Sequence, residues 1–226
     1  QRGVVNKFIG DAIMALFSEG KPDPLTGEII SPSDRAVKAA IGMRHQLEEF
    51  NKNQQLTHAE ILNMGVGINT GPLMLGTVGS IHRLDTTVIG DSVNLASRLE
   101  KLTQFYRSSI IISEWTYQAL SSPDSLLIRE IDLVVVKGRT EPCNIYEVFE
   151  GDAEEEKELK LRTRDIIKAG ISRYKARKFK EAITYFKEAK TLNPKDLIPI
   201  LYIKRCVEYL KNPPPPSWSG VFKVHA

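Results

Sequence analysis

The sequence predicts a domain of the α/β or α+β class, followed by a small all-helical region. Up to about residue 151, short β-favouring runs alternate with runs in which apolar residues recur at helical spacing. After a charged stretch over residues 152–162, expected as a linker, helical spacing resumes from 163 to 212. Four consecutive prolines at 213–216 end the helical region, because proline cannot continue a helix, and the tail over 213–226 should be extended.

Composition narrows the classes of partner. The 226 residues carry a net charge of +3, which is too small to predict a nucleic-acid or membrane-surface partner. No apolar run approaches the roughly 20 residues that a membrane-spanning helix needs. The two cysteines, Cys143 and Cys206, give neither a disulfide framework nor a zinc spacing, which favours a reducing, cytoplasmic compartment. Because the sequence lacks an initiator Met and opens inside a strand-like run, we expect a fragment of a longer protein.

The first expected element is a β-hairpin. Apolar runs over residues 4–9 and 12–17 flank Gly10 and Asp11, and Gly-Asp suits a tight hairpin turn. A Pro-, Gly- and Ser-rich loop separates this hairpin from a helix that begins near Ser33. The later elements expected in this domain are a strand ending at Gly71, a short strand over 72–79, a strand-like run to Gly90, a helix over 91–106, a buried strand over 108–113, a short helix over 114–122, and a strand pair over 126–138 and 143–151.

Two large polar side chains share one face of the helix expected over residues 91–106. Asn94 and Arg98 lie four residues apart, so they project from the same side. The residues around them are apolar: Val93, Leu95, Ala96 and Leu99. A mostly buried helix is therefore expected, and its polar groups need partners. Those partners are either other side chains of this chain or a bound molecule. A solvated polar stripe is the plain alternative, and the spacing alone leaves all three open.

Three runs together resemble the catalytic domain of class III nucleotidyl cyclases, in particular the bacterial-type adenylate cyclases. They are KFIGDAIMALF over residues 7–17, the series GVGINTG, LGTVGS and TTVIGDSVNLASRLE between 65 and 100, and VVVKGRTEPCNIYEV over 134–148. The resemblance covers residues 1–151. It implies an α+β fold, ferredoxin-like or palm-like, in which a central and mostly antiparallel sheet is flanked by helices.

The resemblance also implies an enzyme that converts ATP into 3′,5′-cyclic AMP and pyrophosphate. In this family two subunits pair head to tail, here as a homodimer, and each active site lies between them. Two Mg²⁺ or Mn²⁺ ions per site are held by two aspartates of one subunit, and carboxylate oxygens suit these hard cations. Asp11, in the hairpin turn, matches the second of these aspartates. Without the resemblance, Asp11 would be interpreted as a turn residue only.

Lys7 and Thr87 match the two positions that read the base in this family. A Lys at the first position donates to a ring nitrogen that accepts in adenine but carries hydrogen in guanine, whereas guanylate cyclases usually carry Glu there. The Thr87 hydroxyl can accept from the adenine amino group. The pair therefore favours ATP. Taken alone, Lys7 also suits a solvated edge-strand charge, and Thr87 an ordinary strand residue.

The same resemblance assigns the groups that act on the ribose and the phosphates. Asn94 resembles the residue that orients the ribose, Arg98 the residue that stabilises charge on the α-phosphate, and Lys137 a lysine that contacts the terminal phosphates. Lys137 also suits an ordinary strand exit.

The sequence departs from the family pattern at two places. The first metal-binding aspartate lies upstream of Lys7 in the family and has no counterpart here, so we expect residues 1–226 alone to be inactive or nearly so. Gly65 stands where the family often has a phosphate-binding Arg.

Residues 163–212 resemble one tetratricopeptide-like helical hairpin with a capping helix. Small and aromatic residues fall at the offsets of that repeat: Gly170, Tyr174, Phe179, Ala182, Phe186, Ala189 and Pro194. One such unit cannot bury its apolar face alone, so a third helix over 197–210 should cover it and bury the Cys206 thiol. A plain amphipathic hairpin is the alternative. The region is a candidate site for a protein partner, and its basic residues are read as a solvated face rather than a nucleic-acid site.

Three functions remain in competition. The leading hypothesis is an adenylate cyclase with a C-terminal helical region. A guanylate cyclase of the same fold is the first alternative, and Lys7 argues against it. A cyclase-like domain that serves only in binding or dimerisation is the second, and the joint presence of Asp11, Asn94 and Arg98 argues against that.

Overall fold

The structure, a computed structural model, describes residues 1–226 except 21–26, 28, 57–60, 81–82, 136–140 and 224–226. Its strands are β1 (Val4–Ile9), β2 (Ala12–Leu16), β3 (Val66–Ile68), β4 (Met74–Ser80), β5 (Arg83–Ile89), β6 (Ile110–Ser113), β7 (Ile128–Val135), β8 (Cys143–Val148) and β9 (Phe222–Lys223). Its helices are α1 (Pro32–Leu56), α2 (Asp91–Tyr106), α3 (Glu114–Gln118), α4 (Glu154–Lys175), α5 (Phe179–Leu192) and α6 (Leu197–Lys211), with a 3₁₀ turn at Pro123–Ser125.

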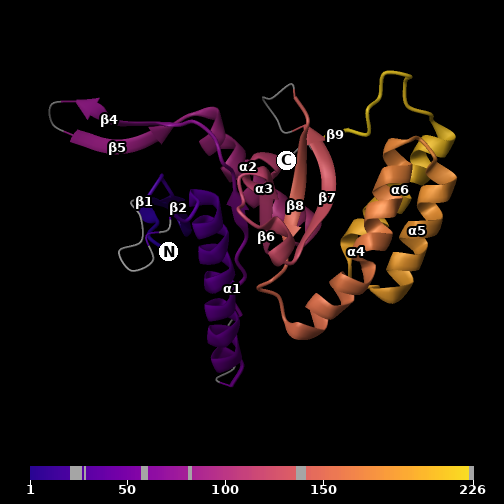
Figure 1. The fold of residues 1–226 in the computed structure, drawn as a ribbon, viewed down its shortest axis with the longest axis horizontal. Coiled ribbons are helices and arrows are strands. Elements are labelled where there is room, and N and C mark those ends of the chain that lie inside the picture. The colour runs from indigo at the N-terminus through magenta and orange to yellow at the C-terminus, as the bar shows by residue number, and fades with distance from the viewer. Residues whose placement is uncertain (21–26, 28, 57–60, 81–82, 136–140, 224–226) are drawn as a thin grey trace.

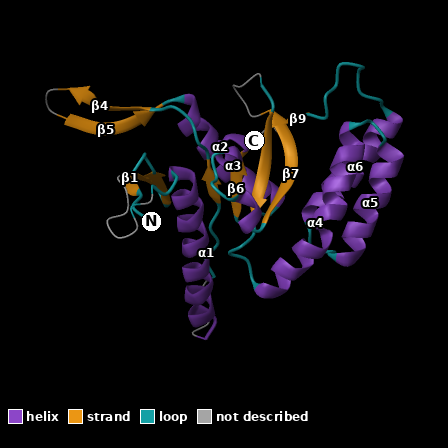
Figure 2. Ribbon diagram, in the orientation of Figure 1, coloured by secondary structure: helices purple, strands orange, loops and turns teal. Residues whose placement is uncertain are grey.

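A mixed five-stranded sheet, in the order β3-β6-β8-β7-β9, forms the centre of the fold (Figure 1). The hairpins β1–β2 and β4–β5 form separate two-stranded sheets, and in Figure 2 the β4–β5 hairpin extends away from the central sheet. Four of the six strand pairings in the described part of the chain are antiparallel; β3–β6 and β7–β9 are parallel. The predicted α+β class, with a sheet flanked by helices and further helices at the C-terminal end, is confirmed.

Strand β6 shows how the sequence divides the core between the two faces of the sheet. Ile110, Ile111 and Ile112 are all fully buried, and successive side chains of a strand point to opposite faces. Ile110 and Ile112 belong to the cluster that contains Val37 of α1, whereas Ile111 belongs to the cluster that contains Leu99 of α2. The continuous apolar run therefore becomes a strand that is covered on both faces, as the sequence predicts.

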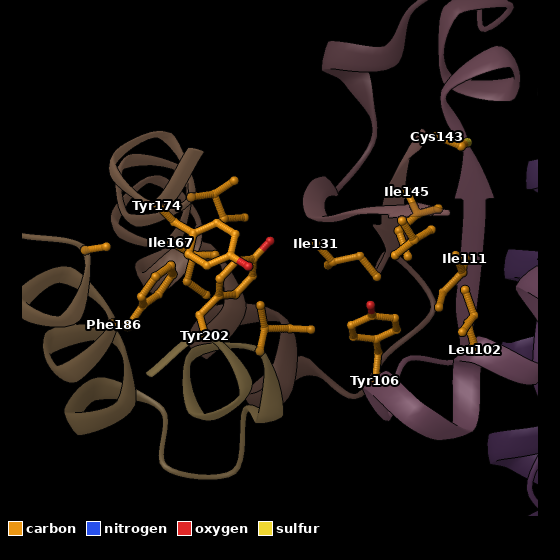
Figure 3. Packing of buried hydrophobic residues seen from close by; sticks show 14 of the residues in the cluster. Leu102, Tyr106, Ile111, Ile131, Cys143, Ile145, Ile167, Tyr174, Phe186 and Tyr202 are labelled. Atoms are coloured by element: carbon orange, nitrogen blue, oxygen red, sulfur yellow. The ribbon is translucent and has the colours of Figure 1, made fainter. Parts of the chain in front are cut away.

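The C-terminal helices share a core with the sheet. The cluster that holds Leu102 of α2 and Ile131 of β7 continues without a break to Ile167 of α4 and to Phe186 and Tyr202 of the next two helices (Figure 3). We call α4, α5 and α6 the helical unit. No helix among the residues that the structure describes is long and apolar enough to cross a membrane.

The expectation of a charged linker over residues 152–162 is corrected, because α4 already begins at Glu154. Three consecutive glutamates, residues 154–156, occupy its first turn, where negative charge is favourable beside the helix N-terminus. Further along this stretch, Lys160 forms ion pairs with Glu147 at 2.8 Å and with Asp152. The Lys160 charge therefore helps to hold α4 against strand β8.

The proline-rich tail runs back over the helical unit and ends in a strand that the sequence did not predict. Arg177 donates to the carbonyl oxygens of Pro214 and Pro215 at 2.6 and 2.7 Å, and the Trp218 ring lies edge-on to Tyr174, with centroids 5.1 Å apart. Strand β9 then pairs in parallel with the end of β7, where Phe222 lies opposite Val134. These contacts hold the tail against both the helical unit and the sheet.

A buried network of charges joins the helical unit to strands β7 and β8. Arg129 of β7 donates to Glu147 of β8 at 2.6 Å and also pairs with Asp196, which caps α6. Lys160 reaches the other oxygen of Glu147. Burial alone would raise the pKa of Glu147, but Arg129 and Lys160 outweigh burial and lower that pKa to about 2.

We therefore expect the free energy of unfolding to fall in acid as Glu147 becomes protonated. A carboxylate with a lowered pKa stabilises the fold above its unfolded pKa of about 4.3 and loses that contribution as pH falls towards 2, on the order of 3 kcal/mol in total. Burial raises the pKa of Asp152, so protonation of that group in acid has the opposite effect on the free energy of unfolding. To isolate the contribution of Glu147, chemical denaturation should compare the wild type with Glu147→Gln. The difference in unfolding free energy between the two proteins should shrink between pH 5 and pH 2, and a constant difference would contradict the assignment.

Candidate active site

Lys7 and Asp11 lie on the predicted hairpin. Strand β1 pairs antiparallel with β2, and Lys7 lies opposite Met14. The turn consists of Gly10 and Asp11; Gly10 adopts φ = 65°, a conformation that glycine reaches without steric cost. Asp11 is exposed at the tip, and Lys7 is also exposed. The predicted hairpin is confirmed, and its turn presents a carboxylate to solvent.

Asn94 and Arg98 lie on helix α2, on the side away from the core. The buried face of this helix consists of Ser92, Leu95, Leu99, Leu102, Thr103 and Tyr106. Asn94 is exposed and Arg98 is half-buried, so the helix is less completely covered than the sequence suggested. Within the described part of the chain, neither side chain has a hydrogen-bonding or ionic partner. This exposure suits either a solvated polar stripe or a surface that binds a molecule.

Close backbone packing fixes the position of α2 against strand β3. A Cβ placed on Gly67 would overlap the backbone nitrogen of Glu100 and the carbonyl oxygen of Ala96, so only glycine lets the strand and helix come this close. A Cβ on Gly65 would overlap the Thr103 hydroxyl. The residue that departs from the family pattern at position 65 is therefore part of this helix-packing surface.

Thr87 and Lys137 are the remaining two predicted site residues. Thr87 lies on β5, where its backbone is opposite Gly76 of β4, and β5 leads through Gly90 directly into α2. Lys137 lies outside the described residues, so its predicted contact with terminal phosphates stays a prediction. The structure thus groups Lys7 with Asp11 on one hairpin, and Asn94 with Arg98 on one helix.

The predicted metal site needs oxygen ligands such as carboxylates. Among the described residues, no three or more His, Cys, Asp or Glu side chains gather in a way that could hold a metal ion. Asp11 alone, exposed on its turn, suits a single oxygen ligand. Mg²⁺ is commonly held by one or two carboxylates together with substrate phosphates, so Asp11 fits the part of the site that the resemblance assigns to it.

A buried polar cluster at the far end of α2 was not predicted from the sequence. Asp132 of β7 is fully buried and accepts hydrogen bonds from Tyr106, the last residue of α2, and from Tyr202 of α6. The available signal was the group of charges Arg129, Glu130 and Asp132 in the run that becomes β7, because a buried strand keeps a charge only where a partner meets it.

Comparison with known proteins gives the family. Residues 5–149 match the family described as adenylate and guanylate cyclase catalytic domain. The chain is 39% identical over 210 residues to the terminal-differentiation-specific adenylate cyclase of Dictyostelium discoideum, a match that covers 92% of this chain and 10% of that protein. A match of that extent continues past residue 149 into the helical unit, while the chain spans only about a tenth of that relative's length.

Two solved structures have the same architecture. The adenylyl cyclase CyaB from P. aeruginosa gives a TM-score of 0.53 at 32% identity, covering 65% of this chain and 71% of that one. The guanylyl cyclase Cya2 gives a TM-score of 0.53 at 31% identity, covering 65% and 69%. With the hairpin, the helix and the mixed sheet in the expected order, these matches show that the chain belongs to the family of adenylate and guanylate cyclase catalytic domains.

Proposed function

We propose that this chain is the catalytic part of an adenylate cyclase, which converts ATP into 3′,5′-cyclic AMP and pyrophosphate. The observation that carries the proposal is the outward face of α2. It presents Asn94 and Arg98 side by side with no partner in the described part of the chain, in the segment that matches a cyclase family. The adenylate cyclase from Dictyostelium, 39% identical, supports the choice of nucleotide.

The proposed chemistry is an in-line displacement at the α-phosphate. The ribose 3′-oxygen bonds to the α-phosphorus, the bond from that phosphorus to the bridging oxygen breaks, and pyrophosphate leaves while the hydroxyl proton passes to solvent. Asn94 holds the ribose so that this oxygen faces the phosphorus. The Arg98 guanidinium carries a fixed positive charge to the oxygens on which negative charge builds. By analogy with oxyanion-hole donors, such a group contributes roughly 3–4 kcal/mol of transition-state stabilisation.

Asp11 is proposed as one ligand of the Mg²⁺ or Mn²⁺ ions. Its exposed carboxylate at the tip of a two-residue turn would bind a cation without first breaking an ion pair of its own within the described residues. When bound, the ions lower the pKa of the 3′-hydroxyl and neutralise charge on the departing phosphates.

The two groups of site residues are proposed to come from opposite subunits of a homodimer. They lie on separate elements, because the hairpin is not paired with the five-stranded sheet on which α2 packs. Large apolar side chains are also exposed on the hairpins, including Phe8 at 71% and Met74 at 74%. Exposed apolar surface of this kind is typical of a protein that contacts a partner.

Two regions are proposed for the chain: a catalytic domain over residues 1–151 and a tetratricopeptide-like unit with a capping helix over residues 163–212. The packing of α4 on α5 supports the second assignment. Gly170 lies against the Phe186 ring so closely that a Cβ would overlap it, while Ala182 and Ala189 are fully buried. Small residues facing an aromatic ring are the pattern that the repeat requires.

The proposed function is tested with the purified full-length protein that contains this chain. Incubation with ATP or GTP and either Mg²⁺ or Mn²⁺ should yield cyclic AMP from ATP. A protein that binds ATP yet forms no cyclic product with either metal would overturn the enzymatic proposal, and a preference for GTP would establish the guanylate cyclase alternative.

Lys7 should determine the choice of base. Lys7→Glu is expected to lower kcat/KM for ATP about tenfold more than for GTP, because one charged hydrogen bond to adenine is lost and a group facing guanine's N–H is gained. The control is Lys187→Glu on the exposed side of α5, which makes the same change of charge far from the site. Equal losses for ATP and GTP would mean that Lys7 acts on the strand or the phosphates instead.

A further inference from the structure

A buried carboxylate connects the proposed catalytic helix to the helical unit. The two oxygens of Asp132 accept hydrogen bonds from the hydroxyl groups of Tyr106, at 2.6 Å, and Tyr202, at 3.0 Å. Oδ1 also accepts from the backbone N–H of Leu133 at 2.8 Å, and Nη1 of Arg205 forms an ion pair with Oδ2 at 2.6 Å. A fully buried charge is tolerated only with partners of this kind, since an uncompensated one is strongly destabilising.

The partners of Asp132 come from both parts of the chain. Tyr106 is the last residue of α2, inside the segment that matches the cyclase family. Tyr202 and Arg205 lie on α6, beyond that segment. In Figure 3, Tyr202 lies near Phe186 among the side chains of the helical unit, whereas Tyr106 lies below Ile131 of β7, towards Leu102. Among the described residues, Tyr106 and Leu133 contact Asp132 as neutral donors, and the cation paired with this carboxylate, Arg205, belongs to the helical unit.

The Arg205 side of this ion pair packs against aromatic rings of both α6 and β9. The Arg205 guanidinium lies 3.6 Å from the centroid of the Phe222 ring, on β9, and 5.0 Å from that of Tyr202. Burial would lower the pKa of Arg205, but Asp132 outweighs burial and raises it, so the guanidinium stays charged. The carboxylate that Tyr106 contacts is therefore fixed by α6 and by the tail strand together.

A helix transmits a constraint at one end to side chains along its length. Arg98 precedes Tyr106 by eight residues and Asn94 precedes it by twelve, which at 1.5 Å per residue places them about 12 and 18 Å along the axis. The buried stripe of α2 lies on the sheet, and the backbone contact at Gly67 limits how close the helix can come. The Tyr106 hydrogen bond adds a specific attachment at the C-terminal end, which limits sliding and rotation.

We propose that Asp132, Tyr106 and Arg205 are positioning residues for the cyclase reaction: through them, the helical unit holds α2 in the place at which Asn94 and Arg98 meet the nucleotide. The inference rests on the proposed function. It also assigns the helical unit a role within the catalytic fold, whereas the sequence suggested only a site for a protein partner. The Dictyostelium match, which continues into the helical unit, agrees with the two parts acting together.

Two matched substitutions in the full-length protein test the proposal. Tyr106→Phe and Tyr202→Phe each remove one buried hydroxyl from the same carboxylate and keep the ring, but only Tyr106 belongs to α2. Tyr106→Phe should lower kcat for cyclic product about tenfold with KM for the nucleotide changed less than about twofold, because a small misplacement of transition-state groups costs rate rather than binding. Tyr202→Phe should lower the melting temperature by about as much as Tyr106→Phe does, but it should leave kcat within about twofold of the wild type. Equal kcat values for the two variants would overturn the proposal.

A second pair of variants tests the contribution of α6. Arg205→Met should reproduce the kcat loss of Tyr106→Phe, and Arg205→Lys, which keeps the charge, should restore most of it. If Arg205→Met does not fold, the comparison of the two tyrosines still decides the outcome.

Hydrogen exchange of residues 91–106 gives a readout that does not need activity. Exchange near Tyr106 should be faster in Tyr106→Phe and in Arg205→Met than in the wild type. A wild-type protein without cyclase activity would refute the proposed function, whereas faster exchange in the two variants than in that wild type would still support the attachment. An active wild type with unchanged exchange and unchanged kcat in both variants would refute the positioning role alone.

Discussion

Arg98→Ala should lower kcat for cyclic product formation by about 10²–10³-fold and change KM for the nucleotide little, because its charge is proposed to act mainly on the transition state. The structure gives this side chain no competing structural duty among the described residues: it is half-buried on the outer side of α2 and makes no ion pair there. The melting temperature should therefore stay close to that of the wild type.

The matched control is Arg162→Ala on α4. Arg162 is exposed and forms only a surface pair with Glu158 at 3.8 Å, so its loss should change neither kcat nor stability by much. A similar loss of kcat in both variants would show that overall positive charge, not the position of Arg98, supports the reaction. A large fall in melting temperature for Arg98→Ala would instead indicate a structural role.

The same substitution tests the shared active site. Asp11→Ala and Arg98→Ala, purified separately and then mixed, should form some dimers in which one site carries both intact residues and the other carries neither. Activity should then rise well above that of either variant alone. If mixed dimers form but activity does not rise, Asp11 and Arg98 act within one subunit and the dimeric site is wrong.

The elements that carry the candidate site were predictable because their signals are local. The hairpin follows from a Gly-Asp pair between two apolar runs, and Gly10 takes the positive φ that such a turn requires. Helix α2 follows from residues at a period of 3.6, which also places Asn94 and Arg98 on one side. Neither prediction depends on residues elsewhere in the chain.

The features that the sequence did not predict depend on contacts between distant residues. Asp132 and Arg205 are 73 positions apart, and no pattern in either segment predicts that the two residues pair. The charged residues 152–162 looked like a linker because their partners, such as Glu147, are buried on a strand. Strand β9 spans two of the described residues, and it pairs with β7 because the tail that follows α6 runs back to the edge of that strand.

Gly67→Ala is expected to reduce both stability and rate. The new methyl group would overlap backbone atoms of Glu100 and Ala96, which cannot move aside as a flexible side chain would, so α2 must shift away from β3. Overpacking of this kind costs about 1–3 kcal/mol of unfolding free energy. Because the shift displaces Asn94 and Arg98 together, kcat should fall about 10–100-fold, measured at a temperature well below the melting point of the variant.

Gly42→Ala is the matched control for this substitution. Gly42 lies within α1, and a Cβ there meets no atom within 4 Å, so the same chemical change should stabilise the helix by about 0.5–1 kcal/mol and leave kcat unchanged. Chemical denaturation and steady-state kinetics on both variants separate the two effects. If Gly67→Ala loses stability but keeps the wild-type kcat, the helix relaxes without moving its polar face, and close packing on β3 does not set the catalytic geometry. If it keeps both, the backbone approach of β3 to α2 is looser than the structure shows.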